Sequence, residues 1–234
     1  MSEATKASPV QPWPGLWRSL REGVAWRWRW VVLPGIKRLV GIRNEQWCRV
    51  VSNRDNETFV RGLDCRLLDV VEISPGNERW RFFPFKSHVC TTYPDYDLCS
   101  GPFKKEAFDL IIAEQVLEHV QRPDRAARSA WEMLRPGGWF LVTTPFLIRV
   151  HAYPDDFSRW TEQGLKGLLV QAGFPEYRLR TGAWGNRACV KASLRRFPSY
   201  IPWLHSLKNE PLFPIVVWAY AQKASIDSSK EAQA

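Results

Sequence analysis

Short apolar runs alternate with amphipathic stretches along most of this chain. Residues 108–113 (FDLIIA) form a run that is apolar enough for a strand buried on both faces. Residues 161–172 instead place apolar side chains at the three- and four-residue spacing of a helix that packs by one face. The pattern predicts strands at 66–73, 108–113, 139–144, 177–181 and 213–221, and helices at 123–134 and 161–172. Strands and helices that alternate with short turns indicate βαβ units, so we expect an α/β fold with a mostly parallel sheet.

Local signals mark the ends of the two predicted helices. Residues 135–138 (RPGG) follow the first helix, and glycine supplies the backbone freedom that a helix end needs. Thr161 is the predicted N-cap of the second helix, and Gly173 directly follows its last apolar residue. Both helices are therefore expected to be short connectors between strands.

The first 50 residues differ from the rest in charge and aromatic content. They carry nine basic and three acidic residues, hence +6 of the net charge of +9, and six of the 13 tryptophans. Such a segment either packs its aromatic rings on the main domain or contacts a membrane surface or an acidic partner. We expect a basic, Trp-rich extension at 1–50, one domain at 51–224 and a disordered tail at 225–234. Nucleic acid is a less favoured partner, because no RNA-binding motif accompanies the basic charge.

The five cysteines show no C-x-x-C spacing, and none of the four histidines lies near a cysteine pair. This pattern argues against a structural zinc site and against a disulfide framework, so we assign no metal ligand. The longest apolar run near the start, residues 30–34, is too short to span a bilayer, and no signal-peptide pattern is present. We expect a cytoplasmic location.

Polar side chains follow the predicted strands at their carboxyl ends, where open parallel sheets bind ligands. Glu72 ends the first strand before a Ser-Pro-Gly turn at 74–76, Glu114 and Gln115 follow the second, and 143–144 end the third. The chain contains no G-x-G-x-x-G, no G-x-x-x-x-G-K-[ST] and no G-x-S-x-G motif. A nicotinamide dehydrogenase, a P-loop NTPase and a serine hydrolase with a nucleophile elbow are therefore disfavoured.

Taken together, these residues resemble the class I S-adenosylmethionine-dependent methyltransferases, in particular the "methyltransferase type 11" branch. The resemblance is strongest over residues 108–145 (FDLIIAEQVLEHVQRPDRAARSAWEMLRPGGWFLVTTP) and extends to VVEISPG at 70–76. It implies a Rossmann-like fold and S-adenosylmethionine as the cofactor. The first motif departs from the family pattern, because Asn77 and Glu78 replace its later glycines.

The resemblance also implies which residues hold the cofactor. Glu72, Ser74 and Gly76 would line its methionine end, and Glu114 and Gln115 would reach its sulfonium region. Asp97 matches the acid beside the adenine amino group, while Tyr93 or Asp95 stands nearest to the acid that usually holds the ribose. The segment before Asp97 is short, so we expect a helix or strand of the family to be missing there.

Residues 151–161 (HAYPDDFSRWT) are similar to a loop that closes over the acceptor in this branch. His151 is the leading candidate for the base that takes a proton from the acceptor, and His119 is its rival. Arg159 either clamps an acidic group of the acceptor or pairs with Asp156 to fix the loop. The substrate side is assigned to His119, Tyr153, Asp156, Arg159 and Trp160.

The function implied is methyl transfer from S-adenosylmethionine to an oxygen or nitrogen of a small-molecule or glycosidic acceptor. Two alternatives remain, an RNA methyltransferase and a non-catalytic, methyltransferase-like binding protein. A membrane-associated acceptor such as a lipid-linked sugar would account for the Trp- and Arg-rich N-terminus.

Overall fold

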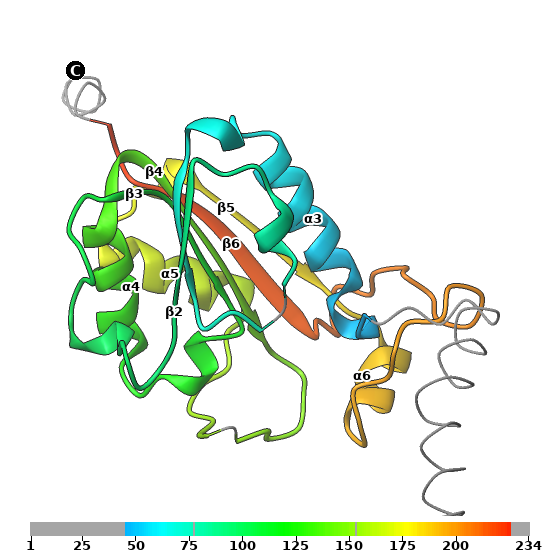
Figure 1. Cartoon of the computed structure of the whole chain (residues 1–234). Coiled ribbons are helices and arrows are strands. Elements are labelled where there is room, and N and C mark those ends of the chain that lie inside the picture. The colour runs from blue at the N-terminus through cyan, green and yellow to red at the C-terminus, as the bar shows by residue number, and fades with distance from the viewer. Residues whose placement is uncertain (1–44, 77, 153, 226–234) are drawn as a thin grey trace, which may run out of the picture. The chain divides into compact units, whose positions relative to one another are not determined.

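A six-stranded sheet runs through the part of the chain that the computed structural model describes, residues 45–76, 78–152 and 154–225 (Figure 1). The strands are β1 Asp69–Ile73, β2 Ser87–Thr91, β3 Phe108–Glu114, β4 Leu134–Pro145, β5 Leu179–Trp184 and β6 Val216–Gln222. The helices are α3 Val50–Arg61, α4 Pro123–Met133, α5 Glu162–Ala172 and α6 Arg187–Ser193. Short 3-10 turns are η2 Trp47–Arg49, η3 Cys65–Leu67, η4 Trp80–Phe82, η5 Leu98–Ser100, η6 Leu117–His119 and η7 Glu176–Arg178.

The sheet is mixed but mostly parallel, with strand order β2-β1-β3-β4-β6-β5. The pairs β1–β2, β1–β3 and β3–β4 are parallel, whereas β6 runs antiparallel to both β4 and β5. The carboxyl ends of β1 to β4 therefore meet at one edge of the sheet. The predicted α/β fold is confirmed, and the predicted site residues of these strands lie along one edge.

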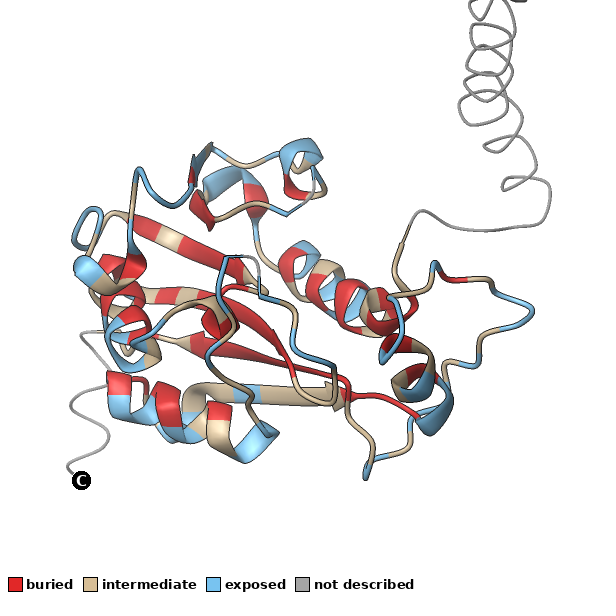
Figure 2. Ribbon diagram, turned by 90° about the horizontal axis from the view of Figure 1, so that it is seen from below, coloured by how far each residue is buried: buried red, intermediate tan, exposed pale blue. Residues whose placement is uncertain are grey.

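Helices cover the sheet on both faces. One core cluster joins α4 and α5 to side chains such as Val71, Ile111 and Val142. The other joins α3 and α6 to side chains that alternate with these, such as Val70 and Leu110. Figure 2 shows the strands largely buried and the helices buried only along one side. None of the helices in the described ranges is long and apolar enough to cross a membrane.

The predicted helix ends agree with the structure. The Thr161 hydroxyl accepts a hydrogen bond from the Gly164 amide at 3.0 Å, and Gly173 has a φ of 113°. The first strand is shorter than its predicted 66–73, because residues 65–67 form η3. Residues 177–178 lie in η7, and β5 continues to Trp184 instead of ending at 181. β4 begins at Leu134, so the RPGG segment is part of that strand.

The sequence pattern misses α3, α6 and β2. Three of the five buried residues of α3 are polar, namely Ser52, Asn53 and Asn56, so no apolar stripe marks this helix. β2 is an edge strand with mostly accessible side chains, and it lacks the apolar run of a central strand. Trp47 and Cys48, placed in the N-terminal extension from the sequence, are buried in the described unit. Residues 1–44 of the predicted extension lie outside the described residues.

The described residues on either side of β2 form no α-helix. Between β1 and β2 the described residues, 74–76 and 78–86, form only η4, in which the fully buried Trp80 packs with Val70 and Leu110. Between β2 and β3 the chain forms only η5, as expected from the shortness of that segment. One tryptophan thus contributes to the core beside a connection where parallel sheets usually place a helix.

Candidate functional site

The turn after β1 has the backbone shape expected of a cofactor motif. Ser74 has a φ of 50°, a left-handed conformation that normally favours glycine. A Cβ atom added at Gly76 would meet no atom within 4 Å, so a ligand has room to approach the backbone there. The chain keeps the tight turn although serine occupies a strained position.

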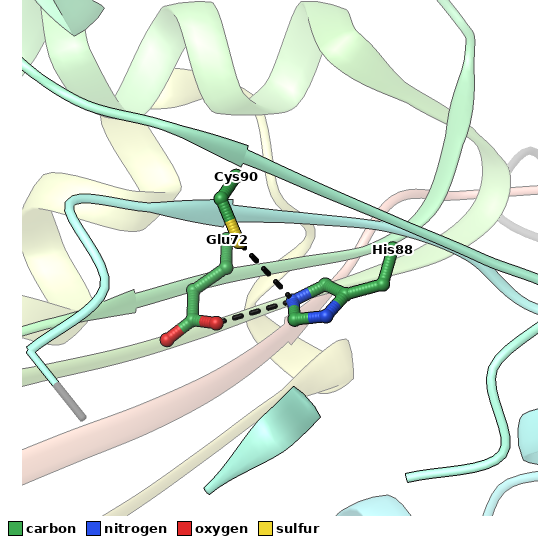
Figure 3. A group of neighbouring side chains, drawn as sticks. All are labelled: Glu72, His88 and Cys90. Atoms are coloured by element: carbon green, nitrogen blue, oxygen red, sulfur yellow. Dashed lines mark hydrogen bonds and ion pairs between the residues drawn. The ribbon is translucent and has the colours of Figure 1, made fainter. Parts of the chain in front are cut away.

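Glu72, at the end of β1, is buried and already has a partner. Its Oε2 atom lies 3.1 Å from Nε2 of His88 on β2, and the same nitrogen lies 3.8 Å from Sγ of Cys90 (Figure 3). Burial, and next the negative charge of Glu114, raise the pKa of Glu72 to about 7. The imidazole and the thiol were not predicted as neighbours of this acid. Their spacing of two residues, which places them on one face of a strand, is the signal in the sequence.

Glu114, at the end of β3, accepts hydrogen bonds from three donors. They are Nδ2 of Asn56 at 2.8 Å, Nε1 of Trp80 at 3.0 Å and Nη1 of Arg79 at 3.4 Å. The next residue, Gln115, has a φ of 59° and donates from its side-chain amide to the Thr143 hydroxyl at 3.1 Å. All three donors come from segments that the sequence analysis left without a role.

A small cavity lies beside these strand ends. It is lined by Arg49, Ser52, Asn53, Arg79, Glu114, Gln115 and Thr143. The lining supplies guanidinium groups and a carboxylate, which would complement the two charges of an amino-acid zwitterion. The cavity measures about 10 Å³, room for one water molecule, so its lining is a candidate contact for the methionine end of the cofactor and does not enclose it in this structure.

The residues assigned to the ribose and adenine follow β2 on an exposed loop. Tyr93 and Asp95 are exposed. The Asp97 carboxylate accepts a hydrogen bond from the Cys99 amide at 2.8 Å and so caps η5. The side chains assigned to the ribose and adenine are therefore accessible, and that of Asp97 also caps a turn of its own segment.

The residues that the sequence assigns to the acceptor lie on η6 and on the loop after β4. The loop docks on η6 through two hydrogen bonds, from the Phe157 amide to the Glu118 carbonyl at 2.7 Å and from the Ser158 hydroxyl to the Leu117 carbonyl at 3.1 Å. This docking places the His151 ring 5.0 Å from the His119 ring, measured between centroids. The two rival bases are therefore neighbours.

Glu118 lies between the two imidazoles and was not predicted. It is fully buried, and neither carboxylate oxygen has a hydrogen-bond partner. Oε1 lies 3.8 Å from Nε2 of His119 and 4.0 Å from Nε2 of His151. Burial raises the pKa of Glu118 to about 7, and burial also lowers the pKa of His151. The signal in the sequence that could have identified Glu118 is an acid next to a histidine, shortly after a buried strand.

The remaining loop residues hold the loop together. Arg159 forms an ion pair with Asp156, whose carboxylate also accepts from the His151 amide at 2.8 Å. Trp160 donates to the Ser158 hydroxyl at 3.1 Å and packs against the core under α4 and α5. Tyr153 lies outside the described residues. Of the two roles considered for Arg159, pairing with Asp156 is the one present in this structure.

Comparison with known proteins identifies a family. The profile of the methyltransferase domain matches residues 40–177. A probable S-adenosylmethionine-dependent methyltransferase of Mycolicibacterium smegmatis is 34% identical over 64 residues, which is 25% of this chain and 25% of that protein. The match thus spans about a quarter of that curated relative.

Solved structures share the fold at low identity. Phosphoethanolamine N-methyltransferase 2 of Haemonchus contortus, with S-adenosylhomocysteine, has a TM-score of 0.51 and 11% identity over 74% of this chain and 53% of that chain. An S-adenosylmethionine-dependent methyltransferase of Mesorhizobium loti has a TM-score of 0.46 and 14% identity over 71% of this chain and 96% of that chain. At 11% identity, the likeness to the Haemonchus contortus enzyme concerns the fold alone.

Proposed function

Because this chain belongs to the methyltransferase-domain family, a class I S-adenosylmethionine-dependent family, we propose that it methylates an oxygen or nitrogen atom of a small-molecule or glycosidic acceptor. Transfer from a sulfonium requires the nucleophile, the methyl carbon and the sulfur to be held in line. It also requires the nucleophile to lose a proton when its pKa is high. The site must therefore bind the cofactor at one place and activate the acceptor at another.

The observation that carries this proposal is the pair of imidazoles at the edge of the sheet. His119 ends η6, the turn that follows β3, and the docked loop brings His151 beside it. Both side chains are 20% exposed, so an acceptor can reach them. We assign the action on the acceptor to His151, with His119 as the rival, and we assign Asp156, Arg159 and Trp160 to the support of this loop.

The cofactor is assigned to the strand ends on the other side of β3. Glu72, Ser74 and Gly76 would hold its methionine end together with Glu114 and Gln115. Arg49 and Arg79, which line the same small cavity, supply positive charge for its carboxylate. Tyr93 or Asp95 would contact the ribose and Asp97 the adenine.

Methyl-transfer assays with the full-length chain test this function. Purified protein and S-adenosylmethionine are incubated with panels of sugars, glycosides, phenols and amines, and S-adenosylhomocysteine is measured. Product that forms only with an added small acceptor supports the proposal. Cofactor binding without turnover on any panel would indicate a binding protein, and turnover on RNA with an affinity that falls steeply with salt would indicate the nucleic-acid alternative.

The location and the N-terminal contact are further parts of the proposal. All five cysteines are free, which supports a reducing compartment such as the cytoplasm. The basic, Trp-rich composition of residues 1–30 supports contact with an anionic membrane surface. A chain lacking residues 1–30 should sediment less with anionic vesicles than the full chain and bind the cofactor equally well. Equal sedimentation of the two forms would contradict the membrane contact.

A further inference from the structure

Three side chains on the acceptor side offer ligand atoms to one point in space. Glu118, His119 and His151 each place one such atom within 4.8 Å of the other two. The distances from the Glu118 carboxylate to the two Nε2 atoms, 3.8 and 4.0 Å, are too long for hydrogen bonds. The three groups converge without being bonded to one another.

The buried carboxylate lacks the compensation that a buried charge requires. Glu118 has no exposed surface, and both of its oxygens are without a hydrogen-bond partner. Removing a carboxylate from water costs several kcal/mol unless a proton or a cation compensates. The guanidinium groups of Arg49 and Arg159 favour its charged form, but among the described residues neither forms an ion pair with it, and Arg159 is already paired with Asp156. A buried acid without a hydrogen bond beside two imidazoles is suited to hold a proton or a cation.

One outer contact of the two rings suits a metal ligand. Nδ1 of His119 lies 2.5 Å from the carbonyl oxygen of Asp155, so this nitrogen carries a hydrogen, and Nε2 is the atom that lies 3.8 Å from Glu118. Nδ1 of His151 lies 3.4 Å from the Asp156 carboxylate and forms no hydrogen bond. Histidines that bind metals usually direct the other ring nitrogen at a carbonyl or carboxylate, as His119 does.

We propose that Glu118, His119 and His151 bind one divalent transition-metal ion through a carboxylate oxygen and two Nε2 atoms. Ligand atoms about 2.0–2.2 Å from an ion are roughly 3.0–3.5 Å apart, so the carboxylate–imidazole distances of 3.8 and 4.0 Å have to shorten by about 0.3–1.0 Å when the ion binds. Two imidazoles and a carboxylate suit Zn²⁺, Mn²⁺, Fe²⁺ or Co²⁺. The partial exposure of both rings leaves a coordination position open to the acceptor. The site differs from the sequence-based assignment, which names no metal ligand.

A second cluster provides an internal control. Glu72, His88 and Cys90 also place ligand atoms within 4.8 Å of one another. There, however, the carboxylate already lies 3.1 Å from the imidazole, at hydrogen-bonding distance (Figure 3). The acid of this cluster has its partner within the protein, so we assign it no ion.

The catalytic use of the ion rests on the proposed function, whereas its binding does not. An ion with an open position beside the transferred methyl group would hold the acceptor's hydroxyl and lower its pKa. His151 would then act as a ligand rather than as a free base. An aromatic or sugar hydroxyl is the acceptor group that benefits most, because its proton is otherwise hard to remove at neutral pH.

Metal titration of the full-length chain without an affinity tag tests the site. The protein is treated with chelator, dialysed and titrated with Zn²⁺, Mn²⁺ and Co²⁺ chloride by calorimetry, and Co²⁺ coordination is followed by its visible spectrum. We expect one ion per chain. E118Q and H119Q should each weaken the affinity at least about a hundredfold, and C90S should leave it unchanged. Circular dichroism checks that each variant is folded.

Two results would overturn the site. One is a folded wild-type chain that takes up none of the three ions. The other is uptake that survives E118Q and disappears in C90S. Calorimetry with S-adenosylmethionine on the same metal-free protein separates failure of the metal site from failure of the proposed function, because the cofactor should bind with or without the ion. Equal turnover of the metal-free and the metal-loaded protein would remove only the catalytic use of the ion.

Discussion

Two glutamates four residues apart, Glu114 and Glu118, differ in whether the protein supplies hydrogen-bond donors to their carboxylates. The Glu114 carboxylate accepts from Asn56, Trp80 and Arg79, whereas the more deeply buried Glu118 accepts from none. The protein itself compensates the first charge, so its position is fixed before any ligand binds. The second carboxylate has no hydrogen bond and lies beside two imidazoles. In our proposal, the difference separates a pre-organised cofactor side from an acceptor side that a bound ion completes.

Removal of the acceptor-side imidazole should have the largest effect. His151→Ala is expected to lower turnover by about 10²–10⁴-fold, because the acceptor loses the group that activates it. Steady-state kinetics with the acceptor found in the screen measures this loss. His205→Gln is the matched control, since that ring stacks on Trp47 at 4.2 Å, outside the proposed site. Full activity of His151→Ala with loss in His119→Ala would transfer the role to His119.

The two glutamates should respond oppositely to the same substitution. Glu114→Leu leaves three donors without their acceptor and should lower the free energy of unfolding by about 2–3 kcal/mol. Glu118→Leu removes an uncompensated buried charge and should raise it by about 1 kcal/mol in metal-free protein. Urea denaturation in the presence of chelator measures both. Destabilisation by Glu118→Leu equal to that by Glu114→Leu would show that Glu118 has a partner within the protein.

The smallest expected effect is a pH dependence of stability at Glu72. Folding raises the pKa of this carboxyl from 4.5 to about 7, so the folded state favours its protonated form. Its contribution to stability is therefore complete below about pH 4.5 and is lost as the pH rises through 7. The groups that face it are His88, Cys90, Glu114 and Arg79.

The neutral variant Glu72→Gln tests this dependence. Its melting temperature should exceed that of the wild type by about 2–4 °C at pH 8.5, equivalent to about 1 kcal/mol, and by less at pH 5.5. Thermal melts at the two pH values measure the difference. An equal difference at both pH values would mean that Glu72 is not the titrating group.

The parts of the fold that the sequence predicts are those with local causes. β3 follows from an apolar run, and α5 follows from its apolar spacing and its two end residues, Thr161 and Gly173. The sequence does not predict α3, because the buried face of this helix is largely polar. Asn56 on that face is buried and donates a hydrogen bond to Glu114. A helix whose buried face carries hydrogen-bonding side chains shows no apolar periodicity in its sequence.

The candidate site, like the fold, has parts that local sequence patterns predict and parts that depend on contacts between distant segments. The positions of Glu72 and Glu114 at strand ends follow from the strand pattern, because parallel strands end at one edge, and His119 lies in the turn after β3. The pairing of Glu114 with residues 56, 79 and 80 depends on contacts between segments distant in the sequence. The meeting of His119 and His151 depends on the docking of the loop at 151–160 on η6, which no local pattern encodes.

Calorimetric titration of S-adenosylmethionine into the full-length chain and two variants tests the division into two sides most directly. The account predicts one cofactor per chain, an affinity at least tenfold lower in Glu72→Ala, about 1.4 kcal/mol, and an unchanged affinity in Glu118→Gln. An affinity that Glu72→Ala leaves unchanged, or that Glu118→Gln lowers as much as Glu72→Ala does, would contradict it.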